Sequence, residues 1–191
     1  MRTLLLAGLL AVPGLVIAAE EPPVPCAAPR LVAENAIAVQ EARAPGMQVR
    51  SLGRQGAHEV YFLTFKSGDD LLSGLAGFAR LHGVKSGSVS AVGALACTVT
   101  GWYDTGISRL HTRALPGNRE VTSLGGNLSM LGDQPLAHLH VAVADRRGRV
   151  LGGHLVRAVV GPGLEVTVTA TPEPLLRTED RAAAAYLPVM P

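Results

Sequence analysis

Residues 59–83, EVYFLTFKSGDDLLSGLAGFARLHG, are the stretch from which the fold of this chain is predicted. The opening run EVYFLTFK is rich in β-branched and aromatic side chains, which favours a strand. The next four residues, Ser67-Gly68-Asp69-Asp70, supply turn and N-cap chemistry for a helix. From Leu71 onward the large apolar side chains recur at helical spacing, and Gly83 suits a left-handed helix end. The stretch therefore predicts a strand followed by an amphipathic helix of about three to four turns.

Downstream of this helix the sequence is typical of β structure, with apolar runs separated by Gly, Asp, Asn and Pro. The predicted strands are residues 87–92, 97–103, 107–115, 120–128, 137–144, 150–160 and 165–170. Because the links are short, antiparallel pairing is expected, since a parallel pair needs a long crossover. Residues 145–149 (DRRGR) predict a hairpin loop between two long strands. The chain is therefore expected to be α+β, a mainly antiparallel sheet of about seven strands with one or more flanking helices.

The first 18 residues predict a secretory signal peptide. A positive start at Arg2 precedes an apolar stretch over residues 3–17, and cleavage is expected near Ala18 or Ala19. An uncleaved membrane anchor is the alternative, but the stretch is short for a spanning helix and contains Pro and Gly. We therefore expect the mature protein in the periplasm or outside the cell, with no membrane span.

The remaining 173 residues divide into three parts by composition. Residues 19–56 are rich in Pro and Ala and predict a linker or loosely packed arm. Residues 57–171 predict one folded domain, since 48% of the chain is hydrophobic and only 17% is charged. Residues 172–191 predict a tail, part short helix and part disordered. Cys26 in the arm and Cys97 in a predicted strand would be able to pair in an oxidising compartment, and the sequence leaves this open.

Three histidines form the main candidate for a chemical site. His138 and His140 lie two residues apart in a predicted strand, so both project from one face, about 7 Å apart at Cα. If the hairpin turns around residues 146–148, His154 becomes their cross-strand or diagonal neighbour. Three imidazoles on one face are typical of a site for Zn²⁺ or a similar divalent ion, and the glycines before His154 leave room for a ligand. The alternative is that the three histidines only pack.

The other titratable candidates are weaker. Glu120, at the start of a predicted strand, is a candidate fourth ligand or a base acting on bound water. The alternative for Glu120 is an ordinary surface carboxylate. His58, His82 and His111 lack partners at ligand spacing, and we interpret them as cap, surface or packing residues.

Five short motifs occur in a characteristic order along the chain. They are residues 66–70 (KSGDD), 90–95 (SAVGAL), 120–126 (EVTSLGG), 138–141 (HLHV) and 148–155 (GRVLGGHL). In this order they resemble the "plants and prokaryotes conserved" domain family over about residues 60–169. The resemblance implies an antiparallel sheet with flanking helices, commonly assembled as a homotrimer. For prokaryotic members it also implies a metal site at the positions of His138, His140 and His154.

Nucleic acid is not an expected partner. The family is often labelled DNA-binding, mainly through members that carry AT-hook segments, but here Arg149 is followed by Val150 where an AT-hook core would have Pro. Removing residues 1–18 takes away Arg2 and no acid, so the formal charge falls from +2 to +1. That charge, without a basic run, is too small for a typical nucleic-acid surface.

These observations favour a metal-binding module that takes a small anionic or carbonyl ligand at the open coordination position. The alternatives are a zinc enzyme with Glu120 as base, a DNA-binding or regulatory protein as the family label suggests, and a purely structural domain.

Overall fold

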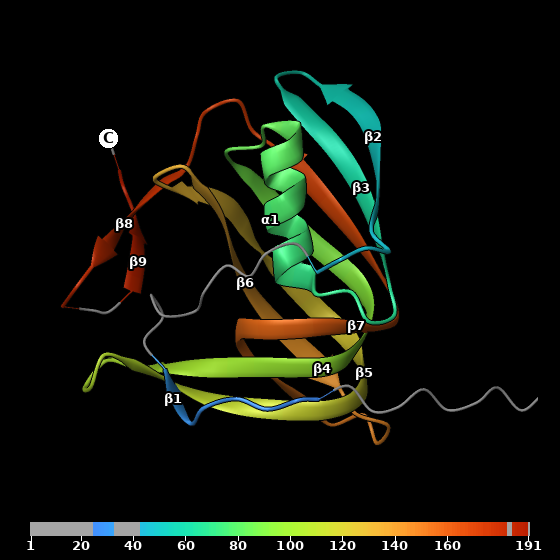
Figure 1. Ribbon diagram of the computed structural model, residues 1–191, viewed down its shortest axis with the longest axis vertical. Coiled ribbons are helices and arrows are strands. Elements are labelled where there is room, and N and C mark those ends of the chain that lie inside the picture. Colours follow the sequence, from blue (N-terminus) through green and yellow to red (C-terminus); the bar gives the residue numbers. More distant parts are fainter. Residues whose placement is uncertain (1–24, 33–42, 183–184, 191) are drawn as a thin grey trace, which may run out of the picture.

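The computed structural model describes residues 25–32, 43–182 and 185–190 (Figure 1). The predicted signal peptide lies outside these residues. One helix packs against a nine-stranded mixed sheet in the described part of the chain. That part contains no helix both long and apolar enough to cross a bilayer. The predicted α+β class, dominated by antiparallel strands, is confirmed.

The predicted strand and helix are strand β3 (His58–Lys66) and helix α1 (Leu71–His82). Asp70 caps the helix, because its side chain accepts a hydrogen bond from the Ser73 N–H at 2.9 Å. Gly83 ends it in the left-handed conformation, with φ 66°. Both predicted caps are therefore confirmed.

Asp69 fixes the turn between β3 and α1. Its side chain is almost fully buried and accepts hydrogen bonds from the N–H groups of Lys66 and Gly46, each at 2.9 Å. Two backbone donors satisfy a carboxylate that would be costly to bury alone. The hydrogen bond from Gly46 also connects the segment before residue 48 to the start of the helix.

The strands after the helix are longer than predicted. They are β4 (Gly87–Asp104), β5 (Arg109–Leu131), β6 (Gln134–Ala144) and β7 (Val150–Ala170). Six of the predicted runs therefore merge in pairs, into β4, β5 and β7. In β4 the register shifts near Gly93 and again near Cys97, and such bulges let a strand bend without leaving the sheet. The Gly and Pro residues that were interpreted as strand ends therefore lie, in part, at bends within continuous strands.

These four strands pair in a closed ring. Strand β4 pairs with β5, β5 with β6, β6 with β7, and β7 with β4, all antiparallel. The ring can close because β4 and β7 are long and curve strongly (Figure 1). Strand β7 also pairs with β3, so the helix-bearing unit is attached to the same ring.

Strands also form within the predicted arm and the predicted tail. Strand β2 (Gln48–Gln55) pairs with β3, and β1 (Leu31–Val32) pairs with β5, so the sheet begins inside the predicted arm. In the tail, β8 (Leu176–Asp180) and β9 (Ala185–Pro188) form an antiparallel pair where a short helix was expected, and β8 joins β5 in parallel. Strand β2 is exposed at nearly every position, so no apolar alternation marks it in the sequence.

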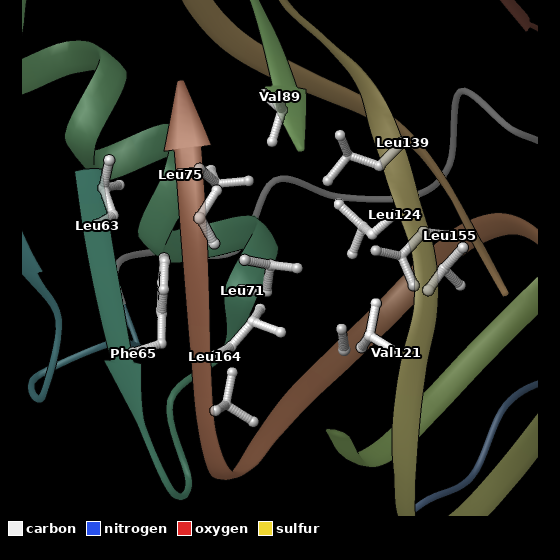
Figure 2. Close-up of a cluster of buried hydrophobic side chains, with 14 of the residues drawn as sticks. Leu63, Phe65, Leu71, Leu75, Val89, Val121, Leu124, Leu139, Leu155 and Leu164 are labelled. Carbon is white, nitrogen blue, oxygen red and sulfur yellow. The ribbon is translucent and has the colours of Figure 1, made fainter. Parts of the chain in front are cut away.

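The main core lies between α1 and the curved strands (Figure 2). Leu71, Leu75 and Phe78 on one face of α1 are fully buried, and Leu139 of β6 packs in the same cluster. Alternate residues of β6 point into this core, so the intervening residues of β6 lie on the opposite face of the strand. The three histidines are therefore presented on the face of the sheet turned away from the helix.

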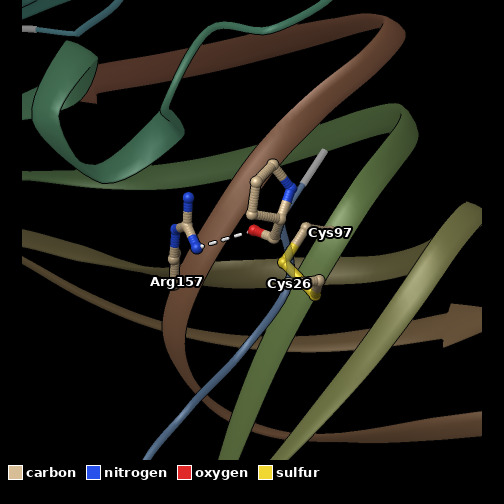
Figure 3. Close-up of a disulfide and its surroundings, with 4 residues drawn as sticks. Cys26, Cys97 and Arg157 are labelled. Atoms are coloured by element: carbon tan, nitrogen blue, oxygen red, sulfur yellow. Dashed lines mark hydrogen bonds between the residues drawn. A yellow bond between two sulfur atoms is a disulfide. The ribbon is translucent and has the colours of Figure 1, made fainter. Parts of the chain in front are cut away.

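A disulfide joins Cys26 to Cys97, which resolves the pairing that the sequence left open (Figure 3). Cys97 is fully buried in β4, and Arg157 of β7 donates a hydrogen bond to the carbonyl oxygen of Pro25 at 3.0 Å. Part of the predicted arm is thus attached to the sheet both covalently and by a charged hydrogen bond.

Candidate metal centre

The β6–β7 hairpin sets the positions of the histidines. The Asp145 side chain accepts hydrogen bonds from the N–H groups of Arg147 and Arg149, and the Gly148 N–H donates to the Asp145 carbonyl oxygen. This turn pairs Ala144 with Val150, and that first pair fixes which residues of β6 and β7 lie opposite each other farther along the hairpin. The predicted hairpin loop is confirmed at residues 145–149.

That register places His140 directly opposite His154. His138 lies two residues along β6 on the same face. One ligand atom from each of the three side chains can be chosen so that all lie within 4.8 Å of one another. The hairpin therefore brings together the three histidines that the sequence singled out.

The rings of the three histidines lie against one another. The ring centroids of His138 and His140 are 5.5 Å apart and nearly parallel. His154 meets both rings edge-on, with centroid separations of 5.0 Å and 5.3 Å. In this arrangement three ring nitrogens can point toward a common position.

Two glycines allow the strands to approach closely at this point. A Cβ on Gly126 would lie 2.0 Å from the carbonyl oxygen of His138, and one on Gly152 would lie 2.2 Å from that of Val141. A side chain at either position would force the backbone apart and displace the neighbouring histidines. A hollow of about 440 Å³ opens beside His140, with Gly152 in its lining. The hollow is lined by both glycines that precede His154, but of the three histidines only His140 is in its lining.

Burial keeps two of the imidazoles neutral. It lowers the pKa of His138 to about 4, and the positive charges of Arg177 and His140 act in the same direction. Burial also lowers the pKa of His154 to about 4, followed by the effects of His138, His140 and Arg177. At neutral pH both side chains are uncharged, so their lone pairs are available to a metal ion.

The donor set fits a zinc-like ion. Zinc holds imidazole nitrogens at about 2.0–2.1 Å in tetrahedral geometry, so ligand nitrogens lie roughly 3.4 Å apart. The candidate atoms lie within 4.8 Å of one another, so ion binding would draw them closer together. Among the described residues the cluster contains three histidines and no carboxylate or thiol. Three protein ligands would leave a fourth coordination position open.

Glu120 does not join this cluster. It pairs with Ala144, four residues along β6 from His140, which is roughly 13 Å at the rise of a strand. Direct or one-water proton transfer needs hydrogen-bond reach, so the register gives no support to Glu120 as ligand or base. Glu120 is instead an exposed residue of a long strand.

The remaining histidines lie elsewhere. His82 packs against the rings of Tyr61 and Phe78, with centroids 5.4 Å and 5.0 Å away. His111 lies 3.2 Å from an Asp104 carboxylate oxygen. Their interpretation as packing and surface residues agrees with these contacts.

Arg177 is a neighbour of the site that the sequence did not indicate. Its guanidinium donates to the Asn127 side-chain oxygen at 3.1 Å and to the Ser129 hydroxyl at 2.9 Å. Asn127 is the cross-strand partner of His138, so the two side chains share a face. Arg177 is largely buried and brings a fixed positive charge beside the histidines. The Pro-rich tail gave no signal for this role, because only the pairing of β8 with β5 places Arg177 here.

Residues 53–172 match the domain family described as Plants and Prokaryotes Conserved (PCC). Among curated proteins, the bifunctional protein GlmU of a Synechococcus strain is 34% identical over 129 residues, which is 62% of this chain. The matched region is only 20% of that relative's length, so the chain spans about a fifth of it.

Two solved structures are similar over most of their length. One is a metal-containing protein from Archaeoglobus fulgidus, with 28% identity and a TM-score of 0.64, covering 75% of this chain and 99% of that one. The other comes from Ralstonia eutropha and is provisionally described as DNA-binding, with 30% identity and a TM-score of 0.64. That match covers 69% of this chain and 91% of the other.

The lowered pKa values predict an acid-sensitive fold for the metal-free protein. The ordinary pKa of these histidines is 6.5 and the folded value is about 4 for His138 and His154. Above pH 6.5 both the folded and unfolded states are neutral at these positions. Between pH 6.5 and 4 only the unfolded state gains the protons, so the free energy of unfolding falls as the pH falls.

Urea unfolding of the metal-free protein between pH 7 and 4 measures this dependence. His138→Gln removes one of the two groups, so its free energy of unfolding should decline less steeply than that of the parent protein. Equal slopes for the two proteins would show that burial does not perturb His138.

Proposed function

The chain belongs to the Plants and Prokaryotes Conserved domain family, and we propose that it is an exported member that binds a divalent metal ion through three histidines. The convergence of His138, His140 and His154 within 4.8 Å carries this proposal. The metal-containing relative from Archaeoglobus fulgidus supports it. We infer Zn²⁺ as the ion, because three neutral imidazoles without sulfur suit zinc. A homotrimer is the assembly that the family resemblance implies.

The metal proposal is tested by measuring bound metal in purified protein. We expect about one zinc ion per chain in the parent protein and at least a tenfold loss of affinity in His154→Ala, since each ligand contributes strongly to the binding free energy. His58→Ala is the matched control, because His58 lies in β3 outside the cluster, and it should retain the metal. A parent protein that binds no metal would contradict the proposal. Sedimentation of the same samples tests the trimer, which a monomer mass would contradict.

We propose that the protein's activity is to bind a small anion at the open coordination position. A bound zinc ion would supply Lewis acidity and that position. The chain itself supplies the hollow beside His140 and the fixed charge of Arg177, which lies on the same face as His138. The positive charge of Arg177 beside the proposed ion would attract a negatively charged ligand to the open position.

Azide binding to the cobalt-substituted protein tests the role of Arg177, since visible absorption reports the coordination of Co²⁺. Arg177→Gln removes the charge and should weaken azide binding roughly tenfold, given the strength of charge interactions at partly buried sites. Arg177→Lys keeps the charge while losing hydrogen bonds, so it should retain most of the affinity. Equal azide affinity in Arg177→Gln and the parent would contradict the electrostatic role, and equal losses in both variants would assign Arg177 a structural one.

Export rests on two observations. Residues 1–18 have the composition of a signal peptide, and the disulfide between Cys26 and Cys97 suits an oxidising compartment. Expression with the native leader should yield a periplasmic protein that begins near Ala19 and contains no free thiol by mass spectrometry. Cytoplasmic protein that keeps residues 1–18, with both thiols reduced, would contradict export. Export would also separate the protein from chromosomal DNA, which disfavours the DNA-binding alternative.

A further inference from the structure

A second hollow, of about 400 Å³, lies at the turn of the β6–β7 hairpin, away from the histidine cluster. Its lining contains four arginines and one carboxylate, a formal charge of +3: Arg119, Arg146, Arg147, Arg149 and Asp145. Arg119 comes from β5 and the others from the hairpin loop. No step of the proposed function uses these residues.

The single carboxylate in the lining of this hollow, Asp145, already binds groups of the hairpin loop. Asp145 accepts hydrogen bonds from the N–H groups of Arg147 and Arg149, and the Arg149 guanidinium pairs with it at 2.7 Å. The Arg149 hydrogen bond is the main cause that lowers the pKa of Asp145 to about 2, so it is ionised at neutral pH. Asp145 therefore neutralises Arg149 and leaves Arg119, Arg146 and Arg147 without a carboxylate from this lining.

Arg119 is the residue that points to a ligand. Its Nε and Nη1 atoms are shielded from solvent, yet neither has a hydrogen-bond partner among the described residues. Buried donors without acceptors cost free energy, and natural structures leave few of them. A guanidinium is a planar fork that matches the oxygens of a phosphate or carboxylate. An oxyanion seated in the hollow would offset the surplus charge, and a rotation of the Arg119 side chain, which also lines the hollow, would turn these donors toward it.

We propose that this arginine-lined hollow binds a compact oxyanion with two or more negative charges. Phosphates and polycarboxylates share the required chemistry, which is several acceptor oxygens within a few ångströms. The hollow is separate from the proposed metal centre, so this site stands or falls independently of metal binding.

Calorimetric titration of the full-length mature chain, freed of metal with a chelator, tests the proposal with pyrophosphate and citrate as probes. We expect one site per chain, with affinity that falls as salt is raised. Binding of pyrophosphate alone would assign the phosphate class, binding of citrate alone the polycarboxylate class, and binding of both the shared chemistry. Failure of both probes at millimolar concentration and low salt would overturn the proposal.

Two variants and one control test where the anion binds. Arg119→Gln should raise the dissociation constant roughly tenfold, because a hydrogen bond to a charged group is lost. Arg147→Gln, in the exposed loop, should raise it by roughly threefold through the loss of a screened charge, and it serves as the test if Arg119→Gln does not fold. Arg54→Gln, exposed in β2, is the matched control and should bind like the parent.

His140→Ala separates this hollow from the histidine site. Unchanged anion binding in His140→Ala supports the arginine-lined hollow. Loss of binding in His140→Ala, or parent-like binding in a folded Arg119→Gln, would place the anion elsewhere and overturn the proposal.

Discussion

Strand β7 is hydrogen-bonded to three other strands, and its register constrains the rest of the molecule. It pairs with β3, β4 and β6 along different parts of its length. A slip of one residue would turn Leu155 and Val166 out of the core and move His154 to the opposite face. The energy that fixes the core thus also fixes the third histidine. Apart from the Asp145 turn, the pairing of β6 with β7 at the candidate site is therefore set by the same contacts that set the core.

The histidine site has nitrogen ligands that suit a metal ion, but it also places positive charge close to that ion. Three imidazoles and the Arg177 guanidinium lie on one face of the sheet, and burial lowers the pKa of His138 and His154. Neutral imidazoles suit a metal ion, while the fixed positive charge suits an anion bound beside it. The glycines at 126 and 152 let the strands that carry the histidines approach closely, since a Cβ at either position would collide with the neighbouring backbone.

Specific polar and covalent interactions hold both ends of the domain to the sheet. Cys26 is bonded to buried Cys97, and Arg177 donates hydrogen bonds to two side chains of β5. Composition suggests loose segments at both ends, because Pro-rich sequence carries little periodic apolar signal. The disulfide and the buried guanidinium add to the strand pairing that attaches these segments to the sheet, and Arg177 also brings a new charge to the site.

The sequence by itself determined the local features. The caps at Asp70 and Gly83, the hairpin at residues 145–149 and the shared face of His138 and His140 depend on short-range geometry, so spacing and residue type predicted them. The tertiary structure alone decided that β4–β7 close into a ring, that Glu120 lies far along its strand, and that Arg177 reaches Asn127. These outcomes depend on pairing between residues distant in sequence and on bulges that bend long strands, and no local pattern encodes either one.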